Sequence, residues 1–289
     1  MFLVQVMLGF SVENTERYSR VVGMADPFQD VDAAGAEFIS AFADSMDARQ
    51  SDPTMEKIVS KYLAKLEFAE GSLTIEVGCG AGAVTRRIAE KVNPARVIGF
   101  EPSVGFVTEA RARVGGYDNV EFEVAGGASL PLDDGSVDNV IMHTVLTHVA
   151  DPAPLLTEAR RVLRSGGCLV VCDADFSKAS LGNLSNDPLD ACAKIFVNEF
   201  VTDPFVVAKL RGLASNAGFT VEDFSLQSRS VLDNDQMLPW VEETGKVLMK
   251  SGEIGEDLHN GLIAEYRRRA REGILFGYQV FATLIARRP

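Results

Sequence analysis

The sequence contains few of the residues that stabilise small secreted domains or bind metal ions. Of its 289 residues only four are cysteine and three are histidine, and the cysteines lack the paired spacing of a zinc site. They are also too few and too scattered for the disulfide framework of a secreted protein. We therefore expect a cytoplasmic protein without a metal site.

Basic residues are scarce relative to acidic ones. Lys and Arg number 28 against 41 Asp and Glu, which gives a formal net charge of −13. A field of that sign repels nucleic-acid backbones and anionic lipid headgroups, so neither nucleic acid nor a membrane surface is expected as a partner. The basic cluster at residues 267–271 is expected to be a solvated helix face.

Long hydrophobic runs are missing as well. The apolar opening, residues 1–10, is shorter than the ~20 residues that a membrane-spanning helix needs, and it has neither a basic flank nor a small-residue cleavage site. We expect neither a signal peptide nor an anchor there. The segment could form a dimer contact or cover the core, and the sequence leaves the oligomeric state open.

The remaining composition is that of a globular protein, with 46% hydrophobic and 24% charged residues. Apolar residues at helical spacing predict two helices over residues 33–49 and 54–68, and hence an N-terminal helical cap over residues 1–70. From residue 73 onward short apolar runs alternate with helical patterns. Because this alternation is typical of βαβ units, it predicts an α/β fold with a doubly wound, mostly parallel sheet over residues 71–289.

The expected elements follow the chain in a regular order. Strands are expected at residues 73–77, 96–100, 120–124, 137–143 and 168–173, with helices at 84–91, 104–113 and 152–163 between them. A polar segment at 177–188 then precedes helices near 189–201 and 204–217, a strand at 219–226, a helical insertion near 236–271 and a last strand at 277–286.

A glycine-rich turn joins the first expected strand to the next helix. The segment Glu76-Val77-Gly78-Cys79-Gly80-Ala81-Gly82 has three glycines at alternate positions. Glycine permits a sharp turn and a close approach to a ligand, and the N–H groups that open the helix face the crevice at the sheet's C-terminal edge. Nineteen residues after Gly82, Glu101 ends the second expected strand, where its carboxylate can bind a ribose diol. The pattern predicts nucleoside binding, and its spacing differs from the G-x-G-x-x-G of dinucleotide folds.

These residues resemble the glycine motif of the class I S-adenosylmethionine-dependent methyltransferases. Residues 130–138 (LPLDDGSVD) and 158–167 (EARRVLRSGG) are similar to segments of the branch that methylates small molecules, the ubiquinone-biosynthesis-like group. The resemblance covers roughly residues 73–171. It implies a Rossmann-like, seven-stranded sheet with an antiparallel last strand, and transfer of a methyl group from S-adenosylmethionine to an O, N or C atom of a small organic molecule.

The resemblance also implies the cofactor-binding residues. The glycines would pass beneath the methionine and ribose parts of the cofactor, Glu76 would lie near its amino group, and Glu101 would bind the ribose hydroxyls. Family members commonly have an acid before Ala128 that accepts a hydrogen bond from the adenine amino group, but here that residue is Gly127. Adenine recognition would then depend on backbone groups of Ala128 and Ser129 or on another side chain. The complete set of candidates is Glu76, Gly78, Gly80, Gly82, Glu101, Pro102, Gly127, Ala128, Ser129 and His143.

His143 is the candidate general base. A sulfonium methyl is already activated, so the protein must chiefly align the reactants, and it needs a base only where the acceptor loses a proton. His143 ends the fourth expected strand and has an unperturbed pKa of about 6.5, although a contact without proton transfer and simple packing are alternatives. For His148 we expect a hydrogen bond to loop backbone. Asp173 and Asp175 can orient an acceptor or accept its proton, or serve as loop hydrogen-bond acceptors.

Substrate selection is expected outside the motif region, in the N-terminal helices and in residues 236–271. The aromatic side chains of Tyr18, Phe38, Phe42 and Trp240 can form an apolar lid or pack in the core. Arg49 can bind the cofactor carboxylate or face water. Two other classes stay open: a nicotinamide-dependent oxidoreductase, and a non-catalytic scaffold that binds a nucleoside.

Overall fold

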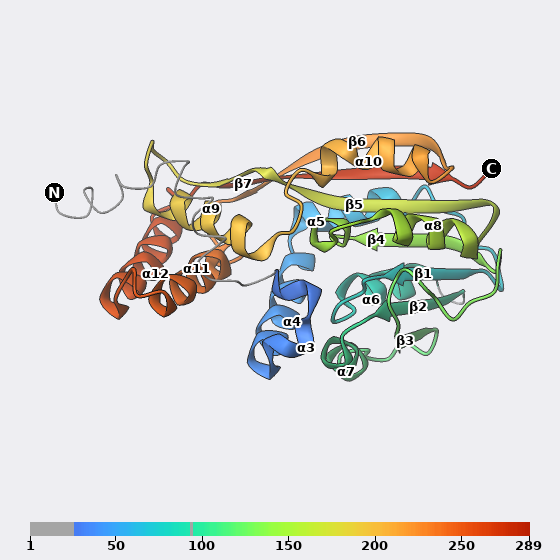
Figure 1. The fold of residues 1–289 in the computed structure, drawn as a ribbon, viewed down its shortest axis with the longest axis horizontal. Coiled ribbons are helices and arrows are strands. Elements are labelled where there is room, and N and C mark those ends of the chain that lie inside the picture. The colour runs from blue at the N-terminus through green and yellow to red at the C-terminus, as the bar shows by residue number, and fades with distance from the viewer. Residues whose placement is uncertain (1–25, 93–94) are drawn as a thin grey trace.

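The computed structural model describes residues 26–92 and 95–289, and it contains one seven-stranded sheet in the order β3-β2-β1-β4-β5-β7-β6 (Figure 1). Adjacent strands from β3 to β5 are parallel, whereas β7 is antiparallel to both β5 and β6. This confirms the predicted doubly wound sheet with an antiparallel last strand. The strands are β1 (Leu73–Val77), β2 (Arg96–Glu101), β3 (Val120–Val124), β4 (Val137–His143), β5 (Leu163–Leu181), β6 (Thr220–Val231) and β7 (Gly277–Arg287).

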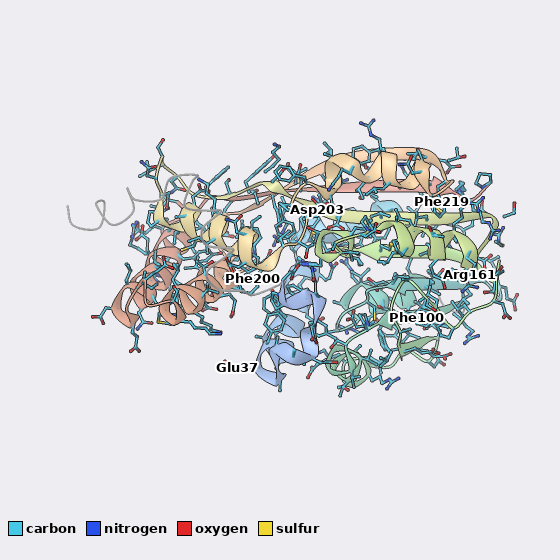
Figure 2. All side chains as sticks on the ribbon, in the orientation of Figure 1. Glu37, Phe100, Arg161, Phe200, Asp203 and Phe219 are labelled. Atoms are coloured by element: carbon cyan, nitrogen blue, oxygen red, sulfur yellow. The ribbon has the colours of Figure 1, made fainter. Side chains whose placement is uncertain are left out.

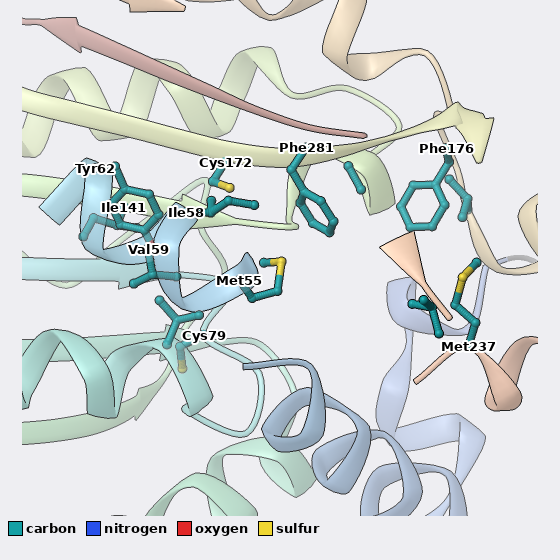
Figure 3. Packing of buried hydrophobic residues seen from close by; sticks show 14 of the residues in the cluster. Met55, Ile58, Val59, Tyr62, Cys79, Ile141, Cys172, Phe176, Met237 and Phe281 are labelled. Atoms are coloured by element: carbon teal, nitrogen blue, oxygen red, sulfur yellow. The ribbon is translucent and has the colours of Figure 1, made fainter. Parts of the chain in front are cut away.

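Helices cover both faces of the sheet because its inner strands alternate apolar side chains to both sides. Ile75 and Val77 pack on one face beneath helices α8 (Ala153–Val162) and α10 (Val206–Asn216). The other face carries α5 (Pro53–Leu63), α6 (Ala83–Val92) and α7 (Val104–Ala112). On that face Ile58 and Tyr62 of α5 lie against Ile141 of β4 (Figure 3).

The remaining N-terminal elements lie near the ligand edge of the sheet. They are η1 (Pro27–Gln29), α3 (Val31–Ala34) and α4 (Ala36–Gln50), and α4 packs on α6 and α7. The helix predicted at residues 33–49 is interrupted at Gly35, because the φ of this residue, 90°, is outside the helical region. Expectations for residues 1–10 and for Tyr18 fall outside the described residues. In the parts of the chain that the structure covers, no helix is long and apolar enough to cross a bilayer.

A group of three helices extends the molecule beyond the parallel strands. In Figure 1, α9 (Pro188–Phe200), α11 (Leu238–Lys250) and α12 (Glu256–Arg271) lie together at the end opposite the C-terminus. The helical insertion predicted near 236–271 is thus two helices, separated at residues 251–255. Strands β5 and β7 extend beyond the shorter parallel strands toward this group, and α9 packs on β5.

Strand β5 is longer than predicted. The expected strand ended at Asp173 and a polar segment was expected from residue 177, but the observed strand continues to Leu181. Its extension pairs with β7, as in Asp175 with Val280 and Ser180 with Tyr278. The hydrogen-bonding partner comes about 100 residues later in the chain, so local polarity did not reveal it.

Candidate functional site

A cavity of about 410 Å³ opens at the C-terminal edge of the parallel strands, within the usual size range of small-molecule sites. It runs from the glycine turn to the helical group, with η1, α4 and the loop after β4 between the two. Residues at the sheet end are Gly78, Gly80, Glu101, Pro102 and Gly127. Residues at the helical end include Phe176, Phe196, Phe200, Arg229 and Trp240.

Glu101 binds the glycine turn and the start of α7 at the same time. Its Oε2 accepts a hydrogen bond of 3.0 Å from the Gly80 N–H, and its Oε1 accepts one of 3.1 Å from the Ser103 N–H. Each carboxylate oxygen has a further lone pair that can accept a hydroxyl. Burial raises the pKa of Glu101, which lines the cavity although its side chain is largely enclosed.

Five of the ten predicted cofactor-binding residues line the cavity, and Gly127 is among them. A Cβ atom at Gly127 would lie 2.5 Å from Cγ1 of Val77, with Leu155 also in contact range. An acid at this position, which the resemblance leads one to expect, would therefore require Val77 to move. The cavity wall includes Gly127 but neither Ala128 nor Ser129, and it also includes the apolar residues Val77, Val149, Ala150 and Leu155.

Gly82 and Glu76 flank the turn without lining the cavity. The Glu76 carboxylate is buried and accepts a 2.5 Å hydrogen bond from Thr85 Oγ1 on α6. Burial raises its pKa to about 8. Because side chains alternate along β1, Glu76 points to the face opposite Val77, which does line the cavity. Its predicted proximity to the cofactor amino group remains a prediction.

We expect the unliganded protein to lose stability between pH 5.5 and pH 7.5 because of Glu76. The folded-state pKa of about 8 exceeds the ordinary value of 4.5, so in this window the folded state holds more protons than the unfolded state. The free energy of unfolding then falls as the pH rises, by up to about 2–3 kcal/mol. Urea unfolding at both pH values should show a clearly smaller fall for Glu76→Gln. Equal falls in both proteins would disprove this assignment.

His143 lies beneath α5 and outside the cavity wall. Its Nδ1 is 3.2 Å from the Tyr62 hydroxyl and its Nε2 is 3.4 Å from Nε2 of Gln50. Burial lowers the pKa of His143 to about 3. As the last residue of β4 it has the same side-chain direction as Ile141, toward α5, because directions repeat every second residue. This position does not support the predicted role as general base or cofactor contact, and the packing alternative fits it better.

His148 is the histidine that the structure brings to the cavity. It lies in η2 (Leu146–His148), and its Nδ1 is 2.8 Å from Oδ2 of Asp26, in place of the expected loop-backbone partner. Asp26 also accepts hydrogen bonds from the Thr202 N–H at 3.1 Å and the Thr202 hydroxyl at 2.9 Å. The Phe28 ring packs 4.5 Å from the imidazole, centroid to centroid. No local signal marks this pair, since 122 residues separate its members.

Asp173 fixes the position of η2 through hydrogen bonds to its backbone. Its Oδ2 accepts hydrogen bonds from the N–H groups of Leu146, at 2.9 Å, and Thr147, at 3.3 Å. Burial raises the pKa of Asp173 to about 6. Asp175 accepts a hydrogen bond from the Ser177 hydroxyl. Neither acid lines the cavity, so their positions fit loop hydrogen bonding rather than contact with an acceptor.

Two arginines contribute positive charge to the cavity wall. Arg49 donates from Nη2 to the Thr144 hydroxyl at 3.2 Å, and burial, followed by the charge of Arg229, lowers its pKa to about 10. Arg229, which sequence analysis missed, lies on β6 at the helical end. Phe42 and Trp240 of the predicted lid also line the cavity. The Phe38 ring packs on the Phe42 ring, with 4.3 Å between the ring centroids. Within residues 26–92 and 95–289 no three His, Cys, Asp or Glu side chains are placed to hold a metal ion.

Comparison with known proteins agrees with this geometry. Residues 75–171 match the family described as Methyltransferase domain. Over 170 residues the chain is 30% identical to a demethylmenaquinone methyltransferase from Tropheryma whipplei, which covers 53% of this chain and 69% of that protein. It is 36% identical over 153 residues to a protein from Mycolicibacterium smegmatis named as a probable S-adenosylmethionine-dependent methyltransferase, covering 53% and 54%.

The solved structure of the YcgJ protein from Bacillus subtilis shares the fold, with a TM-score of 0.56 at 16% identity over 80% of this chain and 98% of that one. The sheet order, the glycine turn and Glu101 define a Rossmann-like protein that binds a nucleoside cofactor. The chain belongs to the class I S-adenosylmethionine-dependent methyltransferases, in the branch that includes small-molecule enzymes. It spans about half the length of two curated relatives, the M. smegmatis protein and a Streptomyces fradiae transposon protein.

Proposed function

We propose that this chain transfers a methyl group from S-adenosylmethionine to an O, N or C atom of a small organic acceptor. The observation that carries the proposal is a single continuous cavity. It joins the glycine turn and Glu101 to an aromatic chamber lined by Phe176, Phe196 and Trp240, and His148 lines the same cavity. The mostly apolar wall and the net charge of −13 favour a small acceptor over a nucleic acid. The demethylmenaquinone methyltransferase named among the relatives supports the same class of acceptor.

The residues at the sheet end fit the cofactor. The buried Glu101 carboxylate keeps lone pairs for the two ribose hydroxyls, and the apolar surface around Gly127 suits an adenine ring. Arg49 is placed to bind the cofactor carboxylate, since its buried Nε has no hydrogen-bond partner among the described residues. When bound, the cofactor supplies a methyl carbon that is activated by a positively charged sulfur. Loss of the methyl group leaves this sulfur as a neutral thioether.

His148 is the residue placed to accept a proton from the acceptor. An imidazole that donates its Nδ1–H to the Asp26 carboxylate, 2.8 Å away, has Nε2 as its proton-accepting nitrogen. Asp26 is itself fixed by Thr202, and η2 is fixed by Asp173, so the imidazole has a defined orientation. The Phe28 ring packs against the imidazole, and Val145 lines the same cavity.

The alternatives have weaker support. The alternate-glycine turn and the family match oppose a nicotinamide-dependent oxidoreductase, and the His148–Asp26 pair favours catalysis over a scaffold that only binds. Four buried, unpaired cysteines are compatible with the reducing cytoplasm as its location.

Calorimetric titration with S-adenosylhomocysteine tests the cofactor site. We expect saturable one-site binding to the wild type and a loss of at least about 50-fold in Gly80→Val. Gly80 has a φ of 53°, and a Cβ there would lie 2.8 Å from Sδ of Met46, so a side chain must distort the turn. Gly116→Val is the control, because a Cβ at Gly116 meets no atom within 4 Å. A folded wild type that binds no cofactor would overturn the proposal, whereas binding justifies a screen for acceptors that gain one methyl mass.

A further inference from the structure

Arg229 is a buried cation whose ion pair with Asp52 is long. Its side chain is 3% exposed, and the nearest acid, Asp52, has its Oδ1 3.7 Å from Nε, beyond hydrogen-bond distance. That oxygen already accepts hydrogen bonds from the N–H groups of Thr54 and Met55 at the start of α5. Among the residues that the structure describes, Nε and Nη2 of Arg229 have no hydrogen-bond partner.

Arg269 shows how the same chain satisfies a structural arginine. Its side chain is similarly buried, yet its Nη1 donates to Asp187 at 2.6 Å and its Nε donates to Glu265 at 2.7 Å. A buried guanidinium without such acceptors is strongly unfavourable, because its desolvation is not compensated. Arg229 therefore has the position of a ligand-binding group, because it lines the cavity and retains donors that the protein does not use.

The cavity that Arg229 lines is also lined by a stack of aromatic rings. Trp240 stacks on Phe196, at 4.9 Å between ring centroids, and on Phe176, at 5.8 Å. Phe196 in turn stacks on Phe200, the last residue of α9, which is labelled in Figure 2. The buried Oε1 of Gln236 also has no partner among the described residues, and it adds a second polar group to this chamber.

We propose that the helical end of the cavity binds an acceptor made of an aromatic or apolar ring body with a carboxylate, and that Arg229 anchors this carboxylate. The guanidinium presents a planar pair of donors that matches a carboxylate in charge and geometry. The stacked rings of Phe176, Phe196 and Trp240 contact the ring body. Since the occupant is taken to be the methyl acceptor, this inference rests on the proposed function.

A pair of probes of equal shape tests the inference. Trp240 is the single tryptophan of the chain, so its fluorescence reports on binding in this chamber. With the protein saturated with S-adenosylhomocysteine, we expect 2-naphthoate to bind about 10- to 100-fold more tightly than 2-naphthamide. Arg229→Met should weaken 2-naphthoate binding by the same factor and leave 2-naphthamide within about threefold. Arg229→Lys, which keeps the charge, should retain a preference for the carboxylate.

The controls separate this inference from the proposed function. Arg267→Met removes a half-exposed arginine of α12 and should change neither probe. Failure of the wild type to bind S-adenosylhomocysteine would disprove the proposed function. Normal cofactor binding with equal affinity for the two probes would overturn the inference alone, as would a loss of cofactor affinity in Arg229→Met that leaves the probe preference intact. If Arg229→Met does not fold, the two probes still test the inference on the wild type and on Arg229→Lys.

Discussion

Glu101→Gln is expected to weaken S-adenosylhomocysteine binding by about two orders of magnitude or more. Two hydrogen bonds from ribose hydroxyls to one carboxylate are charge-assisted, and each such bond contributes roughly 1.5–3 kcal/mol. Removing the charge weakens both. The expected loss is therefore at least about 100-fold in the dissociation constant measured by calorimetry.

The internal hydrogen bonds of Glu101 add to this effect. The carboxylate accepts one backbone N–H on each oxygen, from Gly80 and from Ser103. A glutamine has one acceptor oxygen, so its NH₂ group must face one of these two donors. The glycine turn or the start of α7 must then shift, and both lie at the cofactor end of the cavity.

A matched variant isolates the role of this carboxylate. Glu121 lies on the neighbouring strand β3, where its exposed side chain pairs with Arg96 at 2.9 Å. Exposed ion pairs contribute little, so Glu121→Gln should bind the cofactor product as the wild type does. If the dissociation constant of Glu101→Gln for S-adenosylhomocysteine is also within about threefold of the wild-type value, Glu101 does not hold the ribose.

The sheet and the glycine turn could be predicted because their signals are local. Parallel strands buried on both faces are short apolar runs, and the turn at Gly78 to Gly82 requires residues that tolerate positive φ. Boundaries were accurate for β1, β3 and β4, each of which begins and ends as expected. The end of β5 was missed because its extension depends on a partner strand that lies far away in sequence.

The site residues depend on contacts that no local pattern encodes. Successive side chains of a strand point to opposite faces of the sheet, so a residue at a strand end can face either a ligand or a covering helix. The side chain of His143 faces the helix α5. His148 is oriented by Asp26, and Arg229 reaches the cavity from β6, beyond the motif region. The identity of the fold could therefore be inferred from the sequence, but the proposed acid–base group and the proposed acceptor anchor required the structure.

His148→Ala is expected to lower kcat by about 10²- to 10⁴-fold for any acceptor that must lose a proton. The side chain lines the cavity, and its Nδ1 is held by Asp26, so the loss removes the placed base without removing a cofactor contact at Glu101. The affinity for S-adenosylhomocysteine should stay within about threefold of the wild type. A combined loss of affinity and kcat would indicate a role in cofactor binding instead.

Three further measurements distinguish proton transfer from a general change in packing. Added imidazole should restore part of the kcat of His148→Ala, because the truncated side chain leaves space for a free base beside Asp26. Asp26→Asn should lower kcat less than His148→Ala does, since Asp26 acts by positioning the imidazole. His259→Ala, on α12 and outside the cavity wall, should leave kcat unchanged. If His148→Ala keeps the wild-type kcat, alignment of acceptor and methyl group is sufficient for catalysis, and this chain uses no general base at that position.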